Sequence, residues 1–122
     1  MATLEKRRTP VPSASVCGPD ALARYFRALG DPTRLQIVEA LLVRERTVSE
    51  LVGLVGAPQS RVSNHLACLK WCRFVEAERS GRQVIYRISD PGVQGLLERA
   101  RSLAQANCDY LATCRRVGPD WI

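Results

Sequence analysis

The sequence has little of what an enzyme or a membrane protein needs. It contains a single histidine, His65, no glycine-rich phosphate loop and no paired carboxylates from which to assemble an active site. Its longest apolar runs, such as residues 40–43, are far shorter than the roughly 18 residues of a membrane-spanning helix, and the first residues show no apolar signal region. We therefore expect a cytoplasmic protein that is not an enzyme.

Cysteine, by contrast, is plentiful for so short a chain. The five cysteines are Cys17, Cys68, Cys72, Cys108 and Cys114. An odd number of cysteines without an export signal argues against a closed disulfide framework and for reduced thiols. Such thiols are either inert core residues or ligands for a soft metal ion.

Length and charge limit the organisation of the chain. The 122 residues carry a net charge of +6, and this length fits one small domain. The basic excess favours an anionic partner, most commonly nucleic acid. Residues 1–19 combine basic residues and prolines without an apolar period, so we expect a flexible basic arm. We assign residues 20–116 to the folded domain and residues 117–122 to a C-terminal tail.

Two helices are predicted at the start of the domain. Apolar residues recur at helical spacing over residues 20–29, and Gly30 follows as a stop signal. Asp31 then has the character of an N-cap, with Pro32 at the first helical position. The second helix continues to about Val43.

A helix-turn-helix unit is predicted next. Thr47 and Glu50 have the spacing of a capping box that opens a third helix. Gly56 suits the left-handed end of that helix, and Pro58 stands at the start of a fourth helix that runs to about Cys72. Two short helices joined by a tight glycine-bearing turn form this unit.

A hairpin and a long helix complete the pattern. Residues 74–79 and 83–89 alternate around a turn at residues 80–81, as expected of a β-hairpin. An apolar stripe that includes Val93 and Leu111 then predicts a last helix of more than twenty residues, which could reach beyond 30 Å. A second copy of the chain would cover its excess length. The fold class is therefore mainly α with a small hairpin, a winged helix-turn-helix in the order α-α-α-α-β-β-α, which dimerises through its terminal helices.

The helix over residues 59–72 is the predicted DNA-reading element. Val62, Leu66 and Leu69 fall on one face and should pack inward. The opposite face carries small polar side chains that allow close approach to base edges in a major groove. The alternative interpretation is a solvated face without a partner.

The hairpin supplies further candidates, because Arg79, Arg82 and Arg87 could contact phosphate or the minor groove of double-stranded DNA. The residues predicted to contact DNA are Gln59, Ser60, Arg61, Ser63, Asn64, His65, Lys70, Arg79 and Arg82.

Three segments of the chain resemble one known family. The run LGDPTRLQI at residues 29–37, SRVSNHL at residues 60–66 and GRQVIY at residues 81–86 are similar to the ArsR/SmtB family of dimeric winged-helix repressors. The resemblance covers about residues 20–115. It implies a homodimer that binds a near-palindromic DNA operator when metal-free and dissociates from it on binding a metal ion.

Two of the metal sites known in that family are excluded here. A zinc-type site between the paired last helices uses Asp, His and Glu ligands, but the last predicted helix of this chain has no histidine. A thiolate site at the start of the third helix uses a Cys-x-Cys segment, whereas residues 46–51 contain no sulfur.

The remaining candidates are Cys68 and Cys72, which lie one turn apart and about 40° apart on one flank of the DNA-reading helix. They most resemble the cadmium- and lead-sensing subgroup, in which a third cysteine comes from the partner's tail. Cys114 lies nearer the expected position, and Cys108 is the alternative. The two tail thiols are about 120° apart in helical projection and cannot easily serve one ion together. His65 shares the flank and is a candidate for a further ligand. A lone histidine in a DNA-reading helix, however, more often contacts the core, the backbone or DNA than a metal ion.

The donor set favours a soft metal ion as the inducer: Cd(II), Pb(II), Hg(II) or As(III). A metal ion bound between the DNA-reading helix and the partner's tail would weaken the free energy of DNA binding by about 1–3 kcal/mol. Other interpretations are that Cys68 and Cys72 are small core residues, that the chain is a thiol-redox repressor without metal, or that it is a winged-helix module for protein interaction.

Overall fold

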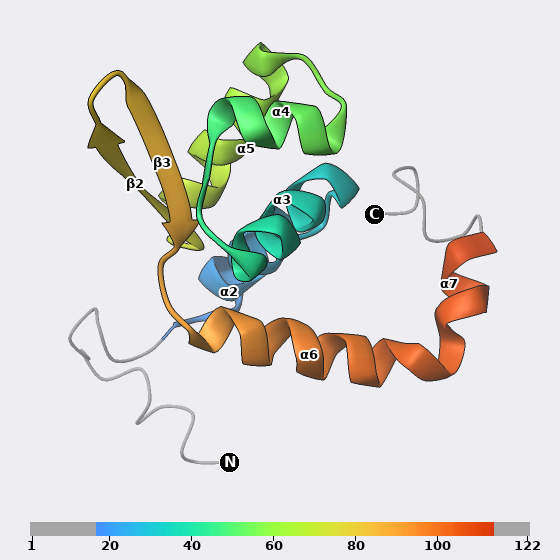
Figure 1. Ribbon diagram of the computed structural model, residues 1–122. Coiled ribbons are helices and arrows are strands. Elements are labelled where there is room, and N and C mark those ends of the chain that lie inside the picture. Colours follow the sequence, from blue (N-terminus) through green and yellow to red (C-terminus); the bar gives the residue numbers. More distant parts are fainter. Residues whose placement is uncertain (1–16, 114–122) are drawn as a thin grey trace, which may run out of the picture.

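A computed structural model describes residues 17–113 and confirms a mainly helical fold with a small antiparallel hairpin (Figure 1). Within this part of the chain no helix is long and apolar enough to cross a membrane. The elements are α2 (Pro19–Ala28), α3 (Pro32–Val43), β1 (Arg46–Thr47), α4 (Val48–Val55), α5 (Gln59–Trp71), β2 (Val75–Ser80), β3 (Gln83–Ile88), α6 (Gly92–Ala104), the 3-10 turn η1 (Gln105–Asn107) and α7 (Cys108–Thr113).

The predicted helix boundaries are set by local hydrogen bonds. The Asp31 carboxylate accepts a hydrogen bond from the Arg34 backbone N–H at 3.1 Å and caps α3. The Thr47 hydroxyl accepts from the Glu50 N–H at 3.2 Å, while the Glu50 carboxylate accepts from the Thr47 N–H at 2.9 Å, which completes the capping box of α4. Gly56 ends α4 with φ 68°, the left-handed conformation that glycine adopts at low cost.

The sheet has one more strand than the sequence predicts. Its order is β1-β3-β2, with Arg46 opposite Tyr86 and Val75 opposite Ile88 in antiparallel register. The hairpin turns at Gly81, whose φ is 64°. Strand β1 has only two residues, too few for an alternating pattern to mark it in the sequence.

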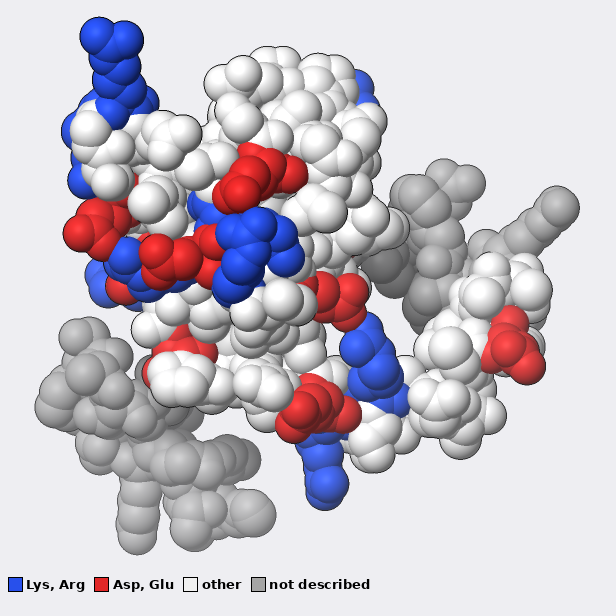
Figure 2. All heavy atoms as spheres, in the orientation of Figure 1, with Lys and Arg blue, Asp and Glu red and all other residues white. Residues whose placement is uncertain are grey.

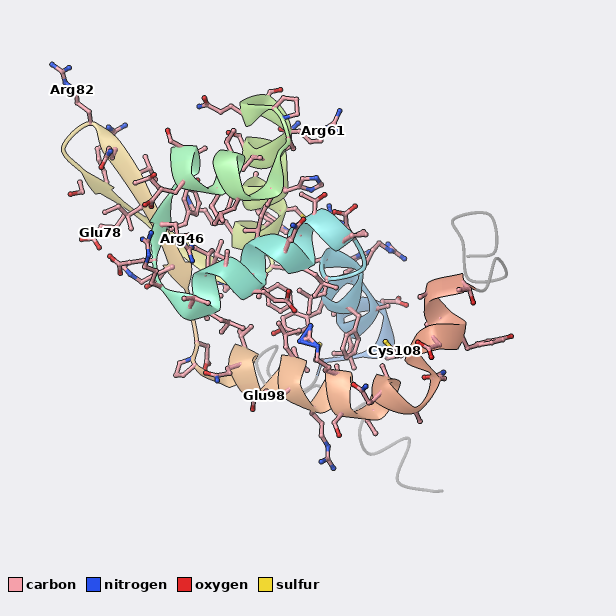
Figure 3. All side chains as sticks on the ribbon, turned by 45° about the vertical axis from the view of Figure 1, so that its right-hand side comes forward. Arg46, Arg61, Glu78, Arg82, Glu98 and Cys108 are labelled. Carbon is pink, nitrogen blue, oxygen red and sulfur yellow. The ribbon has the colours of Figure 1, made fainter. Side chains whose placement is uncertain are left out.

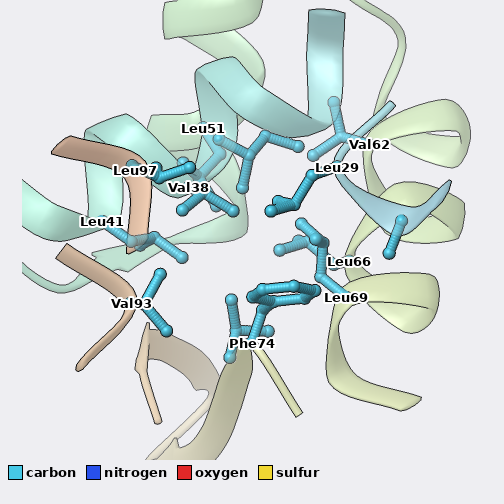
Figure 4. Close-up of a cluster of buried hydrophobic side chains, with 13 residues drawn as sticks. Leu29, Val38, Leu41, Leu51, Val62, Leu66, Leu69, Phe74, Val93 and Leu97 are labelled. Carbon is cyan, nitrogen blue, oxygen red and sulfur yellow. The ribbon is translucent and has the colours of Figure 1, made fainter. Parts of the chain in front are cut away.

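The core lies where the helices meet the base of the hairpin (Figure 4). Val62, Leu66 and Leu69 of α5 are fully buried, which confirms the predicted inward face of this helix. Phe74, just after α5, is fully buried as well. The orientation of α5, and therefore of its opposite face, is fixed by this packing.

The last predicted helix differs from the expectation of one long element. The chain forms α6, then bends through the 3-10 turn η1, and continues as the short α7 (Figure 1). Leu103, Tyr110 and Leu111 keep the apolar stripe but are 73%, 57% and 42% exposed. Helical continuity in proteins comes chiefly from packing, and within residues 17–113 little packs against the stripe beyond Leu97.

Candidate DNA-reading helix and thiol pair

The turn at residues 56–58 presents α5 at the surface of the helix-turn-helix unit. Away from its buried side, this helix carries polar side chains, half of them short. Those predicted to contact DNA are Gln59, Ser60, Arg61, Ser63, Asn64 and Lys70, all of which are exposed. The helix therefore has one face fixed in the core and the opposite face free to enter a groove.

The arginines of the hairpin are in two different situations. Arg82 extends outward from its tip (Figure 3), and Arg79 is also exposed; within residues 17–113 neither forms an ion pair. Arg87 instead contacts the carboxylates of Glu45 at 3.4 Å, Glu76 at 3.5 Å and Glu78. The carboxylates of Glu78 and Glu45 raise the pKa of Arg87 above its usual value.

Acidic and basic side chains accordingly alternate over the base of the hairpin, while basic side chains project at its tip (Figure 2). The charge of Arg87 is balanced by its ion pairs with glutamates of the same chain. Arg79 and Arg82 are therefore the cations of the hairpin that are available to phosphate.

Two hollows border the DNA-reading helix. The smaller, about 220 Å³, lies between the start of α4, Gln59 of α5 and the hairpin residues Arg82 and Gln83. The larger, about 880 Å³, lies between the end of α5 and strand β2, where Lys70, Arg73 and the 86%-exposed Trp71 form part of its wall. The surface is therefore hollowed near both ends of α5.

His65 is placed differently from the other predicted DNA contacts. Its side chain is 16% exposed, and its Nδ1 accepts a hydrogen bond from Nη1 of Arg34 at 3.1 Å. The Asp31 carboxylate lies 3.9 Å from its Nε2. Asp31 and Arg34 belong to the sequence run 29–37. Local sequence pattern predicts the capping role of Asp31 but not the contacts of these two residues with His65. Contact between His65 and DNA stays a prediction.

Cys68 lies on α5 and Cys72 one turn later at its C-cap, both half-buried at the edge of the core. Burial raises the pKa of the Cys72 thiol, and the neighbouring Cys68 raises it further, whereas the charge of Arg34 opposes the rise. A pair of thiols in this arrangement fits two ligand positions of a soft ion.

The pair needs a donor from elsewhere to complete a three-sulfur site. Among residues 17–113, no group of three or more His, Cys, Asp or Glu side chains is placed to hold a metal ion. Cys108, at the start of α7, is exposed (Figure 3), as is Cys17. Cys114 lies outside the described residues. The choice between Cys108 and Cys114 therefore stays a prediction.

The terminal helices expose large apolar side chains. On α2, Leu22 is 43% and Phe26 52% exposed, and on the C-terminal helices Leu103 and Tyr110 are more exposed still. Such apolar surface on adjoining helices is typical of an association interface.

This fold, with a solvent-facing helix that has small polar side chains and a basic wing tip, defines a winged helix-turn-helix regulator that binds DNA. Residues 31–77 match the family described as "Bacterial regulatory protein, arsR family". The chain is 46% identical over 99 residues to a probable mercury resistance operon repressor of Streptomyces lividans, a match that covers 81% of this chain and 79% of the relative. The chain belongs to the ArsR family and is a transcriptional regulator, not an enzyme.

Two solved structures extend the comparison. The homodimeric winged helix-turn-helix DNA-binding domain Mb0332 of Mycobacterium bovis, a possible ArsR-family regulator, is 29% identical with a TM-score of 0.67, and the match covers 80% of this chain and 94% of that one. The cadmium metal-sensor CmtR of Mycobacterium tuberculosis is 43% identical with a TM-score of 0.55, over 63% of this chain and 80% of that one.

Proposed function

We propose that this chain is a transcriptional repressor that binds operator DNA as a homodimer and is released when a soft metal ion binds its thiols. The observation that carries the proposal is the position of Cys68 and Cys72. Both thiols lie on the element that reads DNA, one turn apart and only half-buried. A ligand held there acts directly on the DNA-reading helix.

The DNA-binding surface consists of the exposed face of α5 and the tip of the hairpin. Gln59, Arg61 and Asn64 have donors and acceptors for base edges or phosphate, and Arg82 reaches the flanking backbone or minor groove. A twofold dimer places two such surfaces side by side, which matches a near-palindromic operator. The homodimeric state of the M. bovis domain supports this arrangement.

The dimer also supplies the missing ligand. We assign it to Cys114 of the partner subunit, with Cys108 of the partner subunit as the alternative. Three thiolates suit Pb(II), Hg(II) and As(III), and Cd(II) binds with a fourth donor. A mercury repressor and a cadmium sensor among the similar proteins support an ion of this class.

The test is a titration of Cd(II), Pb(II), Hg(II) and arsenite into the full chain. Sulfur-to-metal absorption and binding to a DNA duplex are followed together, with a duplex that the metal-free protein selects from a random-sequence library. We expect Cys68→Ser and Cys72→Ser to abolish the release of DNA, and the control Cys17→Ser to retain it. Full release of Cys72→Ser by every ion would refute the site, and release by peroxide alone would favour the redox alternative.

A further inference from the structure

Arg34 ties three helices together through one side chain. Its Nε donates a hydrogen bond to the carbonyl of Ala28 at 2.7 Å, and its Nη2 donates to the carbonyl of Arg27 at 3.4 Å. Its Nη1 donates to Nδ1 of His65 at 3.1 Å. Arg34 lies on α3, the two carbonyls close α2, and His65 lies on α5. The angle between the DNA-reading helix and the α2–α3 junction therefore depends on this guanidinium.

The contact also fixes the state of the histidine ring. A guanidinium has no acceptor, so Nδ1 of His65 must be unprotonated and must accept the bond. The single proton of the neutral ring then resides on Nε2, which faces the Asp31 carboxylate at 3.9 Å. Held in this way and largely buried, His65 works as an anchor point for α5.

This anchor lies beside the thiol pair. His65 precedes Cys68 by three residues and Cys72 by seven, so all three side chains share one flank of α5. The positive charge of Arg34 also acts to lower the pKa of the Cys72 thiol.

We propose that the Arg34–His65 hydrogen bond is a latch, which holds α5 in its DNA-reading orientation and is released when Cys68 and Cys72 bind the inducer. This inference rests on the proposed function. Thiols lose their protons when they bind a metal, and three thiolates around a divalent ion leave a net negative charge. That charge attracts the guanidinium, because hydrogen bonds to ionised acceptors are stronger than those to neutral ones. Arg34 then leaves Nδ1 of His65, and α5 loses its anchor.

The single histidine permits a direct test by NMR, since its ring signals need no assignment among residues and the couplings to the ring C–H protons distinguish Nδ1 from Nε2. The ¹⁵N-labelled full chain is observed before and after Cd(II) addition, with site filling followed by sulfur-to-metal absorption. We expect the metal-free ring to carry its proton on Nε2 and the Nδ1 resonance to shift as Cd(II) fills the site. A proton on Nδ1 in the metal-free protein, or an Nδ1 resonance unmoved at full occupancy, would overturn the latch.

Two substitutions test the function of the latch. His65→Phe removes the acceptor, whereas His65→Asn offers an oxygen close to the position of Nδ1. We expect His65→Phe to bind the selected duplex at least about fivefold more weakly without metal, and Cd(II) to weaken it by less than about twofold more. His65→Asn should recover the wild-type ratio between the DNA affinities without and with Cd(II), whatever its absolute affinity for the duplex. Arg101→Gln is the matched control, because it removes an arginine contact to α3 at Glu39 without touching α5.

The affinity for metal separates a latch from a mere packing role. Because coupling is reciprocal, releasing the latch must strengthen Cd(II) binding to the DNA-free protein, so His65→Phe should bind Cd(II) more tightly than wild type. Unchanged or weaker Cd(II) binding in His65→Phe would overturn the latch. If Cd(II), Pb(II), Hg(II) and arsenite all fail to release wild-type protein from DNA, the proposed function fails and the latch with it. Release of wild type with an unmoved histidine resonance refutes only the latch.

Discussion

Tyr25 of α2 stacks on Phe74, with ring centroids 4.2 Å apart and an interplanar angle of 28°. Phe74 lies between the end of α5 and the start of β2, so this pair joins a terminal helix to the helix-turn-helix unit and the hairpin. The packing of α5 and the packing of α2 are therefore connected through one aromatic contact.

The first prediction concerns this contact. Phe74→Ala leaves a cavity in the core and should lower the free energy of unfolding by about 3–5 kcal/mol. The control, Phe26→Ala, truncates a ring that is 52% exposed and should cost the isolated chain far less. Chemical denaturation at a low, fixed protein concentration compares them. Equal losses in the two variants would contradict the assignment of Phe74 to the core.

The second prediction concerns the association surface. Leu103→Glu replaces an apolar side chain of α6 that is 73% exposed with a charged one. We expect this change to shift the protein from dimer to monomer without unfolding it. Val43→Glu makes the same change at a side chain that is 75% exposed at the end of α3, and should leave the dimer intact. Sedimentation velocity over a range of concentrations measures the shift. A Leu103→Glu dimer as stable as wild type would place the interface elsewhere.

The third prediction concerns the hairpin. Arg82→Gln should weaken DNA binding for all sequences alike and lower the salt dependence by about one counterion, as expected of a side chain that we assign to the phosphate backbone. The control, Arg99→Gln, removes one positive charge from an exposed position on α6 and should leave the salt dependence of DNA binding unchanged. Binding isotherms at several salt concentrations give the slopes. Equal slopes for the two variants would mean that Arg82 acts only through net charge.

The contrast between Arg82 and Arg87 shows where sequence reasoning ends. Caps such as Asp31 and Thr47 were predictable because their partners lie three residues away. The inward face of α5 was predictable from its period. Arg87, however, appeared equivalent to Arg79 and Arg82, although it is held by Glu45, 42 residues away, and by the neighbouring strand. Local pattern contains no signal for such a contact.

The same limit applies to the thiol site and the last helix. Cys68 and Cys72 were predictable as a pair from their spacing, but the Arg34–His65 contact spans 31 residues and needed the structure. The predicted long final helix was wrong because a period measures only which side chains share a face. It does not tell whether another part of the chain packs against that face. Within residues 17–113, little packs against the apolar face beyond α6.

The fourth prediction concerns pH. Burial and the neighbouring Cys68 raise the pKa of Cys72 in the folded chain above the ordinary thiol value of 9.0. The folded state therefore binds this proton more tightly than the unfolded state, so the thiol's contribution to stability is fully present below pH 9.0 and is lost as pH rises beyond it. Metal-free wild type should lose more stability than Cys72→Ala as the pH rises above this value. Urea denaturation at a series of pH values checks it, and parallel losses would contradict the raised pKa.

The last prediction separates the two tail thiols. A cysteine that completes the site of the other subunit must reach across to that subunit's thiol pair as a free thiol. Cys108 opens the short helix α7, whereas Cys114 follows the last described turn. We expect Cys114→Ser to lose one sulfur-to-metal bond and most of the release of DNA, while Cys108→Ser keeps both. Heterodimers of Cys114→Ser with Cys72→Ser test the arrangement between subunits. Each purified heterodimer assembles one intact site from one chain's thiol pair and the other's tail, so it should recover half of the absorption of wild type. Absence of recovery would mean that the third sulfur comes from the same chain.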